Sequence, residues 1–477
     1  MPFVRPFVRL LALICGAPLL SQCLPGTEVA APSWRHWVLG EPVAVGGDAA
    51  PAATAYVFCT RRPAMLVEDA GYLRGLQQRF GARGFVVVAV VGDLPADRDA
   101  VAKAWDGCRI VLDQDGSVSS AWLGRDTAPW NVVLLDRQGM VAFVGTSDAG
   151  LVDVIEPVLD GKPRLDGERV AFSLRAEIQA GYDDLDGDDL VRQLDRLLQH
   201  APHDGIAHGL RYVTEIQKRL APDAAQQART AALLQLAAEP RPLAAFADLA
   251  LRCDPHGDGL AAALLEPLAA AVKAVPDDTV VRLAHLRASV LVGDSREVGR
   301  AAMRMQKAVL RSADACLDFV AVLATDKDAV VHRDLAQRTL ARAEQLGANP
   351  RLLAAARYAA AVRCQEDAAA AKRLMDEYLG DDGAANLNND CWYLMTDLAT
   401  MGRFDWFAHG LAERMLAQRD AMQSHEFDTA ALAMFQVGRV ADAIELQQTA
   451  IAKGGNGPDY RMRLQRYQKA AAAMPPK

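Results

Sequence analysis

The sequence lacks a Cys-x-x-C pair, although it contains 8 cysteines. Without two neighbouring thiols, the dithiol–disulfide exchange of redox enzymes is not expected. The cysteines are scattered: Cys15, Cys23, Cys59, Cys108, Cys253, Cys316, Cys364 and Cys391. The last four lie in Ala- and Leu-rich stretches, where a cysteine is usually a small buried apolar residue. A disulfide framework is therefore not expected either.

An excess of positive charge is also missing. Lys and Arg number 52 against 60 Asp and Glu, the net charge is −8, and no basic stripe stands out. Nucleic-acid binding is therefore not expected. The chain also lacks a phosphate-binding loop, a G-x-S-x-G elbow, a dinucleotide fingerprint and the spacing of zinc fingers or H-E-x-x-H sites. His200, His203, His208 and His256 are interpreted as loop residues, and no cofactor or metal is expected.

The remaining composition predicts a globular protein of more than one domain. The chain has 477 residues, which is more than one hydrophobic core usually organises. It is 51% hydrophobic and 23% charged, a balance typical of folded domains. Aromatic residues make up only 6%, and alanine becomes dense after residue 165, which favours close-packed helices there.

The N-terminus has the pattern of a secretion signal. Two arginines precede an apolar run from Leu10 to Leu20, about half of the ~20 residues that a membrane span needs. We expect residues 1–31 to be a signal peptide or lipoprotein signal, and the protein to be periplasmic or at the cell envelope. An uncleaved N-terminal anchor or a misassigned start of the chain is the alternative. The motif L-S-Q-C ending at Cys23 resembles a lipoprotein processing box except at its glutamine, so a lipid anchor at Cys23 is the one membrane attachment considered.

Before residue 162, apolar runs alternate with helical patterns. We predict strands at residues 43–45, 55–58, 84–91, 109–112, 131–135 and 140–144, and helices at 65–80, 97–105 and 151–159. The run from Gly84 to Val91 is continuous and β-branched, as expected of a strand buried on both faces. This order predicts an α/β domain with a mixed sheet and helices on both faces.

Three segments carry a resemblance to a known family. They read W-V-L-G-E-P-V at 37–43, V-F-C-T-R-R-P-A-M-L-V-E at 57–68, and A-P-W-N-V-V-L-L-D-R-Q-G at 128–139. They resemble the TlpA-like redoxin group of exported thiol–disulfide reductases. The resemblance covers residues 34–162 and implies a thioredoxin-like fold there.

The resemblance also implies that the catalytic positions have changed. Arg62 falls on the nucleophilic cysteine, Met65 on the resolving cysteine, and Pro129 on the cis-proline that faces the active site. Arginine cannot act as a nucleophile, and its charge opposes the dipole at a helix N-terminus. Methionine cannot resolve a mixed disulfide. A redox-inactive domain is therefore expected.

Two single cysteines keep an alternative open. Cys59 or Cys108 would serve as a one-cysteine thiol or peroxide site if reactive; otherwise both are packed and inert, and a disulfide between them depends on geometry. The loop also offers a candidate anion or peptide site at Thr60, Arg61 and Arg62. Helix N-terminal N–H groups and guanidiniums bind carboxylates; the alternative is two solvated surface arginines.

Residues 165–477 have a helical pattern almost throughout. The segment F-D-T-A-A-L-A-M-F-Q-V-G-R-V-A-D-A-I-E-L-Q-Q-T-A-I at 427–451 resembles a tetratricopeptide repeat with Gly438 in its turn. A weaker copy at 391–408 has Gly402 in the turn. Such repeats stack by burying each helix pair on the next. An all-α solenoid of helix pairs that binds a protein or peptide is therefore predicted.

One acidic loop weakly resembles a calcium site. Asp184, Asp186 and Asp188 alternate, but Asp189 stands where a calcium loop needs glycine. The alternative is a loop that leads into a helix whose first turn favours acidic residues.

Together these patterns predict an exported binding or scaffold protein with a redox-inactive thioredoxin-like domain at 34–162 and a helical-repeat interaction domain at 165–477. The alternative is a thiol oxidoreductase or peroxidase that acts through Cys59.

Overall fold

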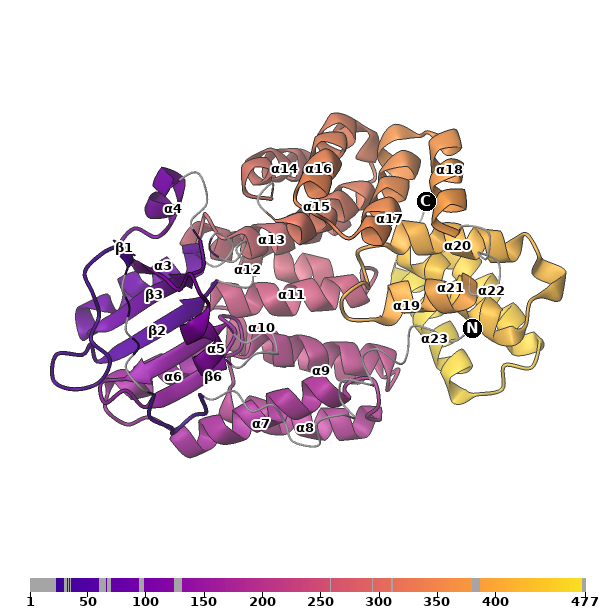
Figure 1. Ribbon diagram of the computed structural model, residues 1–477. Coiled ribbons are helices and arrows are strands. Elements are labelled where there is room, and N and C mark those ends of the chain that lie inside the picture. The colour runs from indigo at the N-terminus through magenta and orange to yellow at the C-terminus, as the bar shows by residue number, and fades with distance from the viewer. Residues whose placement is uncertain are drawn as a thin grey trace. The chain divides into compact units, whose positions relative to one another are not determined.

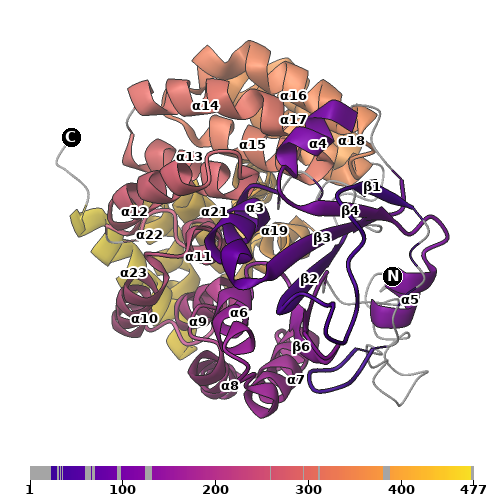
Figure 2. The same cartoon turned by 90° about the vertical axis from the view of Figure 1, so that its left-hand side faces the viewer.

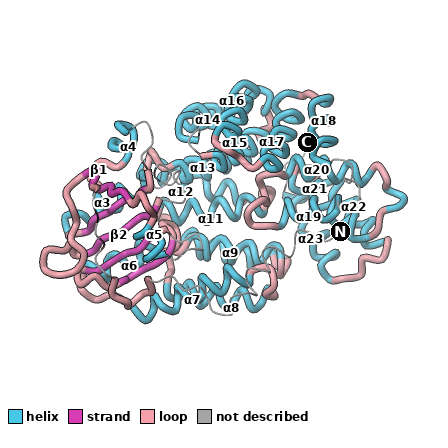
Figure 3. Tube along the Cα trace, in the orientation of Figure 1, coloured by secondary structure: helices cyan, strands magenta, loops and turns pink. Residues whose placement is uncertain are grey.

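The computed structural model describes residues 23–29, 32, 34, 36–59, 66, 70–93, 98–123, 131–257, 259–293, 295–309, 312–379 and 387–473. The chain divides into two compact units. The first comprises residues 1–181 and 196–204, and the second comprises residues 182–195 and 205–477. All strands of the described chain belong to the first unit, as the colours of Figure 3 show.

A mixed sheet of six described strands forms the first unit. The strands are β1 (Trp37–Leu39), β2 (Ala53–Phe58), β3 (Phe85–Val91), β4 (Arg109–Leu112), β5 (Val132–Asp136) and β6 (Val141–Gly145). They lie in the order β1-β4-β3-β2-β5-β6; β2, β3 and β4 are parallel, and the other neighbours are antiparallel. Figure 2 shows the strands of this sheet. Strand β2 is central and ends immediately before Cys59.

Five of the predicted strands are confirmed in position, and one is not. The strand predicted at 43–45 does not form. The edge beside β4 is taken by β1, where Trp37 pairs with Val111. Val43 packs its side chain into the core instead. The continuous run in β3 is buried along its whole length, as predicted.

Helices cover both faces of the sheet. They are α3 (Ala70–Phe80), η1 (Gly81–Arg83), α4 (Arg98–Ala104), α5 (Ser117–Leu123), α6 (Leu151–Leu159) and α7 (Leu165–Gly181). Leu73 of α3 and Ile155 of α6 belong to the core of one face. Trp122 of α5 and Phe172 of α7 belong to the core of the other.

Helix α5 was not predicted from the sequence. Its start is fixed by a side chain from the preceding turn. The Asp113 carboxylate accepts hydrogen bonds from the backbone N–H of Val118 at 3.2 Å and of Ser119 at 2.8 Å. An acidic acceptor at a helix N-terminus satisfies N–H groups that otherwise lack partners. This local cap makes a seven-residue helix from a stretch with weak apolar periodicity.

The first unit continues past residue 162, where the sequence pattern changes. Arg175 of α7 donates to Asp204 at 2.9 Å and to the carbonyl of Ala149 at 2.6 Å. Both ionic side chains are almost fully buried. These contacts join α7 and the turn at 201–204 to the sheet. They are strong links, because breaking a buried ion pair costs more folding free energy than breaking an exposed one.

The second unit is mostly helical (Figure 1). Its helices are α8 (Gly187–His200), α9 (Gly205–Gln217), α10 (Pro222–Leu236), α11 (Pro240–Cys253), α12 (Leu260–Ala274), α13 (Thr279–Val292), α14 (Ser295–Val309), α15 (Ala313–Thr325), η2 (Ala329–His332), α16 (Arg333–Gln345), α17 (Pro350–Ala360), η3 (Ala361–Gln365), α18 (Ala368–Leu379), α19 (Leu387–Thr396), α20 (Asp405–Leu416), η4 (Arg419–Ala421), α21 (Ser424–Gln436), α22 (Val440–Ala452) and α23 (Pro458–Ala473). The C-terminal residues of α8, 196–200, lie in the first unit.

Several consecutive helices of the second unit pack against each other, among them α12 with α13, α19 with α20 and α21 with α22. In the pair α21–α22, Gly438 has φ +81°, a left-handed conformation that favours glycine. Ala443 of α22 is fully buried where the helices meet. Gly402, with φ +70°, lies against Arg252, whose Cα is 2.6 Å from where a Cβ would lie. Both predicted turn glycines therefore occupy tight turns.

The helix pairs do not form a simple open row. Arg252 of α11 donates to the carbonyl of Leu398 at 3.1 Å, and Arg287 of α13 donates to that of Gly402 at 3.2 Å. Arg403 donates to Asp318 of α15 at 2.9 Å. The segment 397–405 thus lies against α11, α13 and α15. In a solenoid each repeat contacts only its neighbours, and the described part of this unit departs from that expectation.

Within the described part of the chain, no helix combines the length and the apolar character needed to cross a bilayer.

Candidate functional site

The redox position predicted from the sequence is only partly described. Strand β2 leads into Cys59, whose backbone N–H donates to the carbonyl of Val90 at 2.8 Å and which is 1% exposed. The predicted positions that follow it lie outside the described residues: Thr60, Arg61, Arg62, Met65 and Pro129. The vestigial dithiol, the candidate anion site and the Ala128–Pro129 bond remain predictions.

The described cysteines are buried, and none of them forms a disulfide. A Cys59–Cys108 disulfide, which the sequence left open, is therefore absent. Burial raises the pKa of the Cys108 thiol to about 12, and it does the same for Cys253 and Cys316. Because the thiolate is the reactive form, such thiols are poor nucleophiles near neutral pH.

Cys23 lies in the core of the first unit. It is 1% exposed, and its backbone N–H donates to the carbonyl of Trp122 at 3.1 Å. Burial raises the pKa of its thiol to about 12. The backbone of the next residues also pairs with the sheet: Gly26 donates to Val141 at 2.7 Å. A diacylglyceryl group on the Cys23 sulfur would have to displace this packing.

The acidic loop before α8 binds the ammonium group of a lysine side chain, Lys218. The Lys218 ammonium donates to the carbonyl of Leu185 at 2.9 Å and also to that of Tyr182. Burial lowers the pKa of Lys218, although Asp183, Asp184 and Asp186 oppose the shift. Asp186 also accepts from the N–H of Asp189 at 2.8 Å, at the start of the helix. The loop therefore caps the N-terminus of α8. The cation that contacts this loop is the Lys218 ammonium group.

The interpretation of four histidines as loop residues is wrong for two of them, because His200 lies in α8 and His208 in α9. The other two bond different parts of the chain. His203 bonds Asp153 through its ring and its backbone N–H, whereas His256 bonds the carbonyl of Gln436 at 3.3 Å. Among the described residues, no group of three or more His, Cys, Asp or Glu side chains has the arrangement to hold a metal ion.

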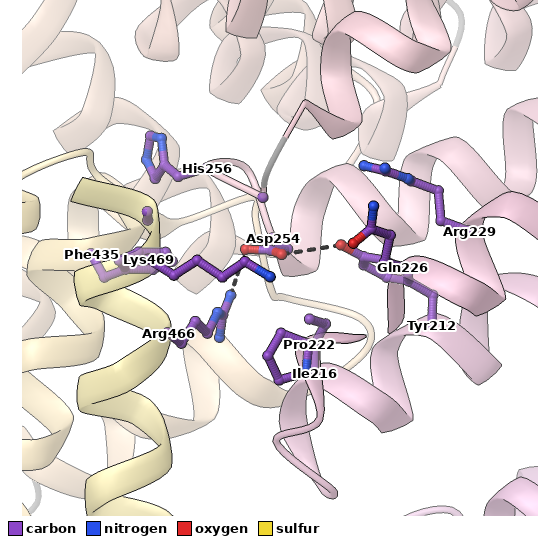
Figure 4. A pocket seen from close by; sticks show the side chains of 12 residues that line it. Tyr212, Ile216, Pro222, Gln226, Arg229, Asp254, His256, Phe435, Arg466 and Lys469 are labelled. Carbon is purple, nitrogen blue, oxygen red and sulfur yellow. Dashed lines mark hydrogen bonds and ion pairs between the residues drawn. The ribbon is translucent and has the colours of Figure 1, made fainter. Parts of the chain in front are cut away.

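A pocket in the second unit brings together charged side chains from three parts of the chain (Figure 4). The cavity has a volume of about 50 Å³. Helices α9 and α10 form one side, α23 another, and the residues after α11 and the end of α21 complete it. Three cations and one carboxylate line it: Arg229, Arg466, Lys469 and Asp254.

Asp254 is the centre of this pocket. It accepts a hydrogen bond from the Tyr212 hydroxyl at 3.1 Å and from Arg466 at 2.8 Å. Arg466 also donates to the carbonyl of Cys253 at 3.3 Å. Burial raises the pKa of Tyr212 well above its ordinary value. Burial alone would lower the pKa of Arg466, but Asp254 outweighs it and raises the pKa. At neutral pH the Tyr212 hydroxyl is therefore protonated and uncharged, and the Arg466 guanidinium carries a positive charge.

His256 forms a neutral part of the pocket wall. Its ring lies edge-on to Phe435, with 5.6 Å between the ring centroids. Burial lowers its pKa from 6.5, and the hydrogen bond to Gln436 and the charge of Asp254 only partly oppose that shift. His256 is therefore uncharged at neutral pH.

Helix α23 holds its place through three cations on one face. Arg463, Arg466 and Lys469 are spaced three residues apart, so their side chains point in similar directions. Arg463 pairs with Asp428 at 2.6 Å, Arg466 with Asp254, and Lys469 with Asp223 at 3.4 Å. The first two pairs are mostly buried, and the third is exposed. The pocket lies beside the second and third pairs.

Sequence reasoning did not find this pocket. The spacing of the basic residues at 463, 466 and 469 was a usable signal, because it predicts one charged helix face. Their partners were not predictable, since Asp254 and Arg466 are 212 residues apart. His256 was noted from the sequence, but only as a loop residue.

Neither protein-family models nor curated proteins include a match to this chain.

Proposed function

We propose that this chain is an exported protein- or peptide-binding protein whose helical unit holds the partner. The observation that carries this proposal is the pocket around Asp254. It combines fixed charges with apolar walls on the helical unit. Such a combination suits recognition, where a few polar groups orient a ligand among apolar contacts. No catalytic group is assigned.

Two features support the finer identification of the units. In the first, three parallel strands continue into an antiparallel hairpin with helices on both faces, which agrees with a thioredoxin-like domain. In the second, the antiparallel pair α21–α22 with its left-handed Gly438 agrees with a tetratricopeptide-like repeat. The first unit would then be a redox-inactive recognition or structural module.

The alternative function, a thiol oxidoreductase acting through Cys59, has less support. Its sulfur belongs to a residue that is 1% exposed. A substrate disulfide must reach the attacking sulfur in line. Because Cys59 is buried, the chain at the end of β2 would have to move before a substrate could reach it.

Peptide selection tests the proposed function. Peptides from a random phage-displayed library are selected on the full-length protein, and the winners are resynthesised with a photo-crosslinking group. Crosslinks are expected at residues 205–473. A selection that enriches no peptide, or crosslinks confined to residues 23–181, would contradict the proposal.

A further inference from the structure

One asparagine of the helical unit stands directly before a glycine. The chain reads K-G-G-N-G-P at 453–458, and of all the asparagines in the sequence only Asn456 is followed by glycine. The carbonyl carbon of an asparagine side chain is an electrophile that the next backbone nitrogen can reach. Glycine shields that nitrogen least, because it has no side chain and the widest choice of backbone dihedrals. The pair Asn456–Gly457 is therefore the place where the backbone most readily attacks its own side chain.

Asn456 lies outside the helices. It belongs to the connection between α22, which ends at Ala452, and α23, which begins at Pro458, and it is exposed. A helix holds its residues at a ψ of about −42°, which keeps the following nitrogen away from the side-chain carbonyl carbon. Asn456 is free of that constraint, so rotation about its backbone can bring the two atoms together.

The connection is anchored on both sides of Asn456. The Gly455 N–H donates to the carbonyl of Ala450 at 3.0 Å, and the Tyr460 N–H donates to the carbonyl of Gly457 at 3.3 Å. Gly455 is buried against the Tyr460 ring, which lies 2.5 Å from where a Cβ of Gly455 would be. Asn456, one residue later, is exposed. Water therefore reaches its amide while the surrounding chain stays folded.

The backbone does not require glycine at position 457. The φ of Gly457 lies outside the left-handed region, whereas that of Gly454 is +104°. A Cβ at Gly457 would have as its nearest described neighbour a ring carbon of Tyr460 at 3.6 Å, an ordinary van der Waals distance. Alanine therefore fits at this position, so a substitution there separates the reactivity of Asn456 from the folding of the chain.

We propose that Asn456 is a site of spontaneous deamidation through a succinimide ring. The backbone nitrogen of Gly457 loses its proton to solvent and bonds to Cγ of Asn456. The bond from Cγ to the amide nitrogen breaks, and that nitrogen leaves as ammonia. Water then opens the ring: attack at Cγ gives aspartate, and attack at the main-chain carbonyl carbon gives isoaspartate.

Both products change the chain where α23 begins. Each adds a negative charge just before Pro458, at the end of the helix where the dipole favours an anion. Isoaspartate also lengthens the main chain by one carbon between the hydrogen bonds of Gly455 and Gly457. The reaction needs only water and no partner, so it is independent of the proposed binding function.

Incubation of the full-length protein for several weeks at mildly alkaline pH tests this proposal. Peptide mapping by mass spectrometry follows each asparagine, and isoelectric focusing follows the added charge. Asn349 and Asn389 are internal controls, because both are exposed. Asn349 precedes Pro350, which has no backbone N–H to form the ring, and Asn389 lies within α19.

Asn456 is expected to convert at least about tenfold faster than either control, a difference of about 1.4 kcal/mol in activation free energy. Both aspartate and isoaspartate are expected at position 456, because the ring opens in either direction. An amide that persists at Asn456, conversion no faster than at Asn389, or aspartate without isoaspartate would each overturn the proposal.

The variant Gly457→Ala tests the attacking nitrogen. Its methyl group shields that nitrogen, and conversion of Asn456 is expected to slow about tenfold, by about 1.4 kcal/mol in activation free energy. The matched control is Gly299→Ala in α14, where no atom of the described chain lies within 4 Å of the added Cβ; its rate at Asn456 is expected to be unchanged. Circular dichroism verifies that both variants fold. Equal rates in all three proteins would overturn the ring mechanism, and if Gly457→Ala fails to fold, the comparison with Asn389 in the unsubstituted protein decides.

Discussion

Asp254 accepts a hydrogen bond from Arg466 at 2.8 Å, although 212 residues separate them in the chain. The side chains are 7% and 12% exposed, respectively. This pair joins the C-terminal helix to the residues that follow α11. It also fixes one wall of the pocket around Asp254.

Removing the charge of Asp254 is expected to destabilise the helical unit. Asp254→Asn leaves Arg466 buried without its counter-charge, and a broken buried pair costs roughly 3–5 kcal/mol. Urea unfolding followed by far-ultraviolet circular dichroism measures this loss. The matched control is Asp223→Asn, because the Lys469–Asp223 pair is exposed and is expected to contribute about 0–1 kcal/mol. If the two variants lose the same free energy of unfolding, burial does not determine how much these ion pairs contribute to stability.

The protein is expected to be inactive in insulin disulfide reduction with dithiothreitol. Arg62 and Met65 stand at the two predicted cysteine positions, and Cys59 is buried. The rate of insulin precipitation is the measurement, and Cys59→Ser is the control. Turnover that is well above background in the unsubstituted protein and lost in this variant would favour the oxidoreductase alternative.

Stability is expected to fall as the pH rises, through Glu168 of α7. Burial is the main cause that raises the pKa of this carboxyl from 4.5 to about 7; Arg175 opposes the shift, and Asp153 adds to it. Between these values the folded protein binds more protons than the unfolded chain. The stabilisation present below pH ~4.5 is therefore lost as the pH rises to ~7, by at most about 3 kcal/mol.

Glu168→Gln tests this pH dependence. The neutral amide is expected to be more stable than the native carboxylate at pH 8 and to differ little from it at pH 4.5, as measured by chemical unfolding at both values. Glu177→Gln, an exposed position on the same helix, serves as the control. If the slope of stability against pH is the same in all three proteins, Glu168 does not titrate as described.

Overpacking the α21–α22 contact is expected to destabilise the second unit. Ala443 is 0% exposed, so Ala443→Leu inserts a side chain where no space exists, at a cost of roughly 1–3 kcal/mol. Thermal unfolding is the measurement. Ala441→Leu makes the same change at an exposed position of the same helix and is expected to be nearly neutral. A stable Ala443→Leu variant would indicate a looser packing of the two helices.

Cys23 is expected to carry no lipid. Its sulfur is buried and its backbone is bonded to Trp122, so an attached diacylglyceryl group would expose this corner of the core. Partition of the expressed protein between detergent and water, with mass spectrometry of the N-terminal peptide, is the measurement. A lipid-modified Cys23, and its loss from the detergent phase in Cys23→Ala, would restore the lipoprotein interpretation.

Local pattern was enough to predict much of the architecture. The run Phe85–Val91 is buried along its whole length because an unbroken series of β-branched side chains suits a strand covered on both faces. Gly438 occupies a left-handed turn because only glycine adopts it without a steric cost. Helix α5 escaped prediction, because its start depends on the Asp113 carboxylate rather than on apolar periodicity.

The sequence by itself determined an α/β part followed by a helical part, since burial periodicity and turn residues act over short stretches of chain. Only the tertiary structure decided where the units divide and which charges meet. The residues of α7 have the same helical periodicity whether they pack on a sheet or on helices, so Arg175 and Asp204 decide its membership. Likewise, the pocket exists because the folded backbone brings α23 to Asp254, and ion-pair partners so far apart leave no local trace in the sequence.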